Sequence, residues 1–161
     1  MSPLGVGLLV AVVSFGVSFL LPVPQNLKTT FEDGQSLYAL GEYKGAIQSY
    51  QKIVKFKNKA VRDDSVRVKF GEDLELPVKV AAWYQLGNAH KKNGQYDEAV
   101  LAYRRVFENQ MVGGDFKATV QFQLADTRFF QESYEEAAKE YRHFITTYPT
   151  SNQVGKAYLY G

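Results

Sequence analysis

The residues best suited to metal binding or proton transfer are two histidines, His90 and His143, and the chain contains no cysteine. The histidines lie far apart, without the His-x3-His spacing that places two ligands on one helix face. The missing cysteines exclude a disulfide framework, a thiolate zinc site, an iron–sulfur cluster and a thiol nucleophile. No phosphate-binding Gly-x4-Gly-Lys-Ser/Thr motif occurs. These residue types predict a non-catalytic protein without a metal, a cofactor or a small-molecule substrate.

The charges are nearly balanced in number but unevenly placed. The 161 residues carry 19 Lys+Arg and 17 Asp+Glu, and this net charge of +2 does not favour binding of nucleic acid. The first 27 residues carry no charged side chain. A basic stretch, Lys52, Lys55, Lys57, Lys59 and Arg62, is either a solvated helix end or a contact with anionic lipid headgroups.

Residues 4–21 form an uninterrupted apolar run. As a helix they would extend about 27 Å, close to the ~30 Å hydrocarbon core of a bilayer. We therefore predict that residues 1–26 are a transmembrane anchor with a Pro-rich exit, since Pro22 and Pro24 follow the run. The alternative is a cleaved signal peptide, but no basic residue precedes the run and no small-x-small site follows it. We expect a single-pass membrane protein whose remaining residues are periplasmic, or cytoplasmic in the opposite orientation, because Lys28 gives little positive-inside bias.

Residues 27–161 contain a repeated pattern. Three segments begin at Gly34, Gly87 and Ala125. In each, a Tyr follows nine positions later, then an Ala, a second Tyr and a bulky apolar residue: Tyr43, Ala46, Tyr50 and Ile53; Tyr96, Ala99, Tyr103 and Val106; Tyr134, Ala137, Tyr141 and Phe144. The last three of each set lie at i, i+4 and i+7, which is one face of a helix. The pattern predicts pairs of helices in which the small residue of the first helix lets the Ala of the second approach closely. Gly41, Gly94 and Glu132 are expected to end the first helices.

The pattern resembles the tetratricopeptide repeat, most clearly at Trp83, Leu86, Gly87, Ala99 and Tyr103. The resemblance implies an all-α solenoid of helix-turn-helix pairs with about three and a half repeats, near residues 27–60, 80–113 and 118–151, with a partial copy at 152–161. Residues 148–151, Tyr-Pro-x-Ser, join the third copy to the partial one. This junction resembles the links between repeats in bacterial envelope proteins. The partial copy is expected to continue in a longer chain or to be covered by a partner.

Residues 57–77 interrupt the repeats. Val66, Val68 and Phe70 alternate with basic residues before a Gly-Glu-Asp turn, and Leu74, Leu76 and Val78 alternate with Glu75 and Pro77 after it. This period of two predicts a small β-hairpin that lies against the helices or a partner, with a flexible linker as the alternative.

The family's first helices line a concave face, and the resemblance implies a protein-binding groove at the matching positions. In this chain they are largely aromatic, which suits an apolar or extended peptide. The expected groove residues are Phe31, Tyr38, Tyr84, Asn88, Lys91, Phe122, Phe129, Phe130 and Tyr158. The alternative is that these rings pack between repeats and leave the groove empty.

The sequence as a whole predicts a non-catalytic scaffold or assembly subunit of a membrane complex, with other proteins, themselves membrane proteins, as its partners. Two alternatives stay open. The chain could be an accessory domain of a longer envelope enzyme, or a secreted peptide-binding module if the apolar run is cleaved.

Overall fold

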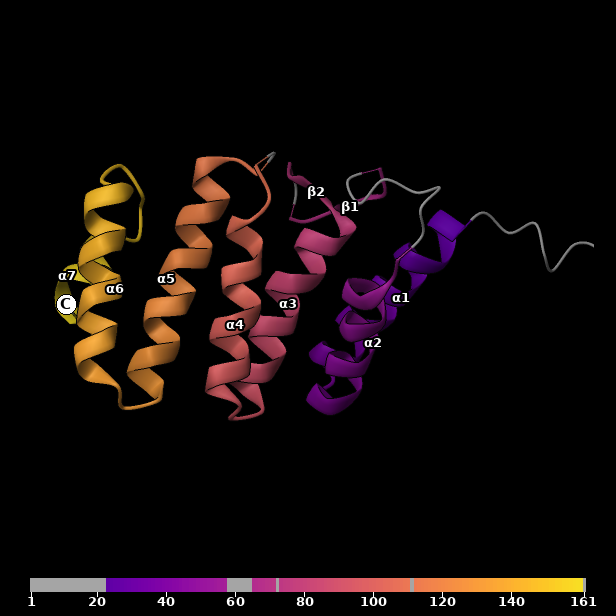
Figure 1. The fold of residues 1–161 in the computed structure, drawn as a ribbon, viewed down its shortest axis with the longest axis horizontal. Coiled ribbons are helices and arrows are strands. Elements are labelled where there is room, and N and C mark those ends of the chain that lie inside the picture. The colour runs from indigo at the N-terminus through magenta and orange to yellow at the C-terminus, as the bar shows by residue number, and fades with distance from the viewer. Residues whose placement is uncertain (1–22, 58–64, 72, 111, 161) are drawn as a thin grey trace, which may run out of the picture.

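The computed structural model describes residues 23–57, 65–71, 73–110 and 112–160. Helices α1 (Val23–Ala39) and α2 (Tyr43–Lys55) form the first pair, α3 (Val78–Lys92) and α4 (Tyr96–Phe107) the second, and α5 (Gly114–Phe130) and α6 (Tyr134–Thr147) the third. The pairs stand side by side in chain order, and α7 (Val154–Tyr160) packs on the last of them (Figure 1). The predicted all-α stack of helix pairs is confirmed, although each pair begins a few residues earlier than expected.

The face predicted from the i, i+4, i+7 spacing forms the core. Tyr50, Tyr103 and Tyr141 are fully buried, together with the Ala and the bulky apolar residue on either side of each. One detail of the packing differs from the prediction. Gly87 and Gly34 face the tyrosine rings of their own pairs, because a Cβ built on Gly87 would lie 2.5 Å from Cε1 of Tyr103 and one on Gly34 would lie 2.6 Å from Cε1 of Tyr50. At these two positions glycine is therefore needed for the approach of a tyrosine ring.

The three short turns share one geometry. Gly41, Gly94 and Glu132 have φ angles of 79°, 75° and 63°. In each turn the next residue donates its N–H to a carbonyl near the end of the first helix, as Gln95 does to His90 at 2.9 Å. This left-handed cap suits glycine and is strained for a residue with a Cβ, so Glu132 holds its conformation at a cost.

The predicted β-hairpin is confirmed. Strands β1 (Arg67–Lys69) and β2 (Glu75–Pro77) pair antiparallel, with Val68 opposite Leu76. Val68 and Leu76 are buried in the main core, and the ring of Phe70 packs at 5.4 Å from those of Tyr84 and Phe116. The hairpin is therefore packed against α3 and α5, which supplies the support that an isolated hairpin lacks.

The N-terminal prediction lies mostly outside the described residues. Residues 4–21, the expected membrane segment, are not described, and α1 already begins at Val23 within the expected exit. Pro24 falls in the first turn of α1, where its missing N–H breaks no helical hydrogen bond. Among the residues that the structure describes, no helix combines the length and apolar character needed to cross a bilayer.

Candidate protein-binding groove

A groove of about 520 Å³ lies along the first helices of the three pairs. Its walls come from α1, α3 and α5, with one residue from the start of α4. The lining residues are Tyr38, Tyr84, Asn88, Lys91, Lys92, Tyr96, Gln123, Asp126 and Phe130. Aromatic faces alternate with amide and charged groups, so the groove can contact both apolar side chains and the polar backbone of a bound segment.

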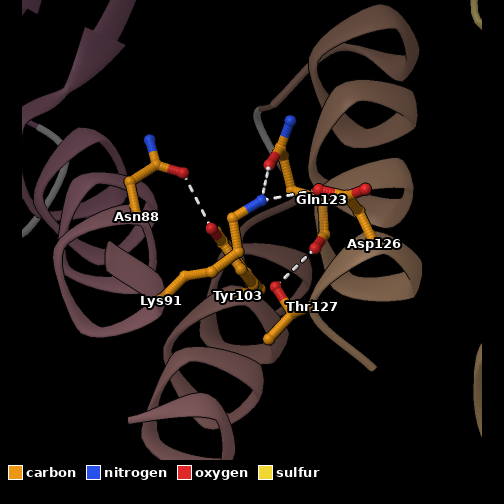
Figure 2. Close-up of polar contacts among 6 residues, drawn as sticks. All are labelled: Asn88, Lys91, Tyr103, Gln123, Asp126 and Thr127. Carbon is orange, nitrogen blue, oxygen red and sulfur yellow. Dashed lines mark hydrogen bonds and ion pairs between the residues drawn. The ribbon is translucent and has the colours of Figure 1, made fainter. Parts of the chain in front are cut away.

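Lys91 links the second and third pairs across this groove (Figure 2). Its Nζ donates to Oε1 of Gln123 and pairs with Oδ2 of Asp126, both at 2.7 Å. The side chains of Lys91 and Asp126 are 14% and 24% exposed, which strengthens the pair relative to one in open solvent. Nζ also lies 5.6 Å from the centre of the Phe130 ring. The lysine charge is therefore neutralised within the protein, and the contact fixes the spacing between α3 and α5.

Asn88 is held in place from two sides. The hydroxyl of Tyr103 donates to Oδ1 of Asn88 at 2.7 Å (Figure 2), and Nδ2 of Asn88 donates to Oε1 of Gln85 at 2.9 Å. Burial raises the pKa of Tyr103, so this hydroxyl keeps its proton and remains a donor. The amide of Asn88 thus has a fixed orientation on the groove wall.

Five predicted groove residues come together in this groove: Tyr38, Tyr84, Asn88, Lys91 and Phe130. They differ in how much surface they offer. Phe130 is 57% exposed, whereas Tyr84 is only 9% exposed because its ring packs against Phe70, Tyr103 and Phe116. Phe130 therefore offers the largest accessible apolar surface in the groove.

The other four predicted residues do not line this groove. Phe31 and Phe122 are 1% and 7% exposed, because each ring packs on the buried tyrosine of its own pair, at 5.7 Å between centres. Phe129 is half-buried beside the aromatic rings of Tyr134 and Tyr160, and Tyr158 is exposed on α7. For Phe31 and Phe122 the alternative reading, that the rings pack within the repeats, is the correct one.

Four lining residues are not in the expected set: Lys92, which directly follows the expected Lys91, and Tyr96, Gln123 and Asp126. Asp126 directly follows the small residue Ala125, just as Asn88 follows Gly87, so the repeat pattern could have found it. The pattern marks Tyr96 as a structural position and gives no signal for Gln123.

The two histidines lie on different helix pairs, His90 on α3 and His143 on α6. His90 is buried, with Nδ1 3.0 Å from Oε1 of Gln95, and His143 is exposed on α6. Over the described ranges, no group of three or more His, Asp or Glu side chains is arranged to hold a metal ion.

Comparison with known families agrees with this geometry. One model of the tetratricopeptide repeat matches residues 80–110, and a second model of the same repeat matches residues 34–56 and 119–151. The chain belongs to the tetratricopeptide repeat family. The three matched segments fall on the three helix pairs, and repeats of this family are typically non-catalytic modules that bind other proteins. A comparison with curated protein sequences finds no match to the chain.

Proposed function

We propose that this protein is a membrane-anchored, non-catalytic scaffold that holds an extended segment of another subunit in the groove along α1, α3 and α5. The observation that carries the proposal is the groove itself, about 520 Å³ with aromatic and amide walls. A solenoid of stacked helix pairs offers such an extended concave surface for protein binding.

The chemistry of the walls suggests what the bound segment contains. An apolar or aromatic side chain would pack on Phe130 and Tyr38, since rings bury much area at low entropic cost. The fixed amide of Asn88 would meet the polar backbone. Lys92 is exposed on the same wall and would favour an acidic group near the apolar one.

The anchoring part of the proposal rests on the uncharged apolar run at residues 4–21. Such a tether would keep the scaffold beside membrane proteins, which we propose as its partners. The intact mass of the protein recovered from washed membranes tests this part. We expect residues 1–21 to be retained; a soluble protein that lacks them would instead support a secreted module.

The scaffold is tested by purification in a mild detergent, followed by identification and quantification of co-purifying proteins. We expect the double variant Phe130→Ser and Lys92→Glu to lose a specific membrane partner, because it alters only exposed groove residues. The matched control is Tyr158→Ser with Lys156→Glu, which makes the same kinds of change on the exposed face of α7. Equal recovery of the partner from both variants, or loss only from the control, would contradict the proposal.

A further inference from the structure

A second groove, of about 500 Å³, lies between α2 and α4 with α3 beneath it. It shares no lining residue with the first groove. Its apolar surface is made by Val54, Trp83, Leu86, Leu101 and Ala102. Leu101 is 63% exposed, although the neighbouring Ala102 and Tyr103 are buried. A recess with an apolar floor and an exposed leucine on its wall is typical of a surface that receives side chains of a partner.

The charged residues around this groove differ between its two ends. Lys55 and Arg105 lie in the last turns of α2 and α4, and Lys57 follows α2, so the three cations gather where both helices end. Arg105 also pairs with Glu108 at 2.6 Å, on the exposed side. At the other end, Glu98 lies in the first turn of α4. The groove is therefore basic overall, and its basic end is distinct from its acidic end.

We propose that this second groove binds one amphipathic helix of a partner protein, whose apolar stripe is bordered by Asp or Glu. Apolar side chains at i, i+3, i+4 and i+7 would fill the recess over Trp83 and Leu86. The acidic residues would lie beside Lys55 and Lys57, because complementary charge orients a docking helix and speeds its association. A flat bilayer surface would meet Leu101 on the wall but would not fill the recess, so a helix fits this shape better than a membrane does.

Trp83 makes the proposal directly measurable, since it is the one tryptophan of the chain and it lines the groove. The full chain, held in nanodiscs of zwitterionic lipid, is titrated with a synthetic helical peptide that has Leu at i, i+3, i+4 and i+7 and Glu at the flanking positions. We expect a saturable blue shift of the tryptophan fluorescence. The same peptide with Lys in place of Glu should bind at least about tenfold more weakly, the factor that ~1.4 kcal/mol gives.

Substitutions separate the electrostatic contribution to peptide binding from the apolar one. The double variant Lys55→Glu and Lys57→Glu should weaken binding about tenfold at low salt and less at high salt, because salt screens exposed charges. Leu101→Ser should weaken it at all salt concentrations. The matched controls are Lys44→Glu and Leu40→Ser, which change exposed residues of the same types outside the groove and should leave binding unchanged.

Three results would overturn the proposal. They are no saturable response to the acidic peptide, equal binding of the acidic and basic peptides, and equal losses in the variants and the controls. If vesicles containing phosphatidylserine alone produce the blue shift and the acidic peptide does not, the groove faces a membrane rather than a partner helix.

Discussion

Three tyrosines, Tyr50, Tyr103 and Tyr141, occupy equivalent positions in the three repeats. Replacement by phenylalanine should nevertheless stabilise the protein at Tyr50 and Tyr141 and destabilise it at Tyr103. All three side chains are fully buried. The hydroxyl of Tyr103 donates to Asn88 at 2.7 Å. The hydroxyls of Tyr50 and Tyr141 are buried and have no hydrogen-bond partner among the described residues.

The expected magnitudes follow from this difference. A buried polar group without a partner costs about 1–3 kcal/mol, so Tyr50→Phe and Tyr141→Phe should each raise the free energy of unfolding by ~1–2 kcal/mol. Tyr103→Phe removes a hydrogen bond worth about 1 kcal/mol and leaves Oδ1 of Asn88 without its donor. Asn88 is half-buried, so water can reach part of it, and the expected loss stays near ~1 kcal/mol.

Urea unfolding followed by far-ultraviolet circular dichroism measures these changes, and an unchanged slope shows that the unfolded states are comparable. The control is Tyr158→Phe, which removes an exposed hydroxyl and should leave stability unchanged within ~0.5 kcal/mol. Destabilisation by all three buried substitutions, or stabilisation by Tyr103→Phe, would refute the hydrogen-bond assignment.

Further predictions concern packing, the turns and pH. Gly87→Ala should destabilise by ~1–2 kcal/mol in the same urea assay, because its Cβ would meet the buried Tyr103 ring and the ~1–3 kcal/mol cost of overpacking exceeds the helix-propensity gain. Gly155→Ala, where the new Cβ would have no neighbour within 4 Å beyond its own helix backbone and adjacent residues, should not destabilise; no loss from Gly87→Ala would show that the ring can move, and equal losses from both would show that the ring is not the cause. Glu132→Gly should stabilise by ~0.5–1 kcal/mol by relieving the left-handed backbone, and a loss of stability would show that the glutamate makes a compensating contact. Burial raises the pKa of the three buried repeat tyrosines, so each stays protonated in the folded chain while the unfolded chain ionises. Stability should therefore be constant with respect to these groups below pH ~10 and fall above it by about 1.4 kcal/mol per pH unit per tyrosine. Ionisation of all eleven tyrosines, the three buried ones included, before the helical signal is lost would contradict this.

The repeat spacing predicted most of the fold because it depends on helix geometry alone. Ala46, Tyr50 and Ile53 had to share a face at i, i+4 and i+7, and they do. The hairpin was predicted in the same way from the alternation of apolar and polar residues, and Val66 and Val68 are indeed buried in the core. Both predictions needed only the local period of the chain.

The site was predicted less completely, because spacing does not give the rotation of a helix relative to its neighbours. Phe31 and Phe122 turn toward the buried tyrosines of their own pairs, whereas Phe130 turns outward. The link from Lys91 to Asp126 joins residues 35 positions apart, and no local pattern predicts it. The second groove combines three helices on both sides of the insertion, so it exists only in the folded stack.

Photocrosslinking from the groove tests the central claim most directly, namely that the concave face holds a segment of another protein. A photoreactive phenylalanine analogue placed at Phe130, the most exposed ring of the groove, is compared in intact cells with the same analogue at the exposed Lys139 on α6. We expect a crosslink from position 130 to one segment of a membrane protein, and its loss when Lys92→Glu is added. Equal crosslinking from both positions, or crosslinks from position 130 only to lipid or within the chain, would contradict the account.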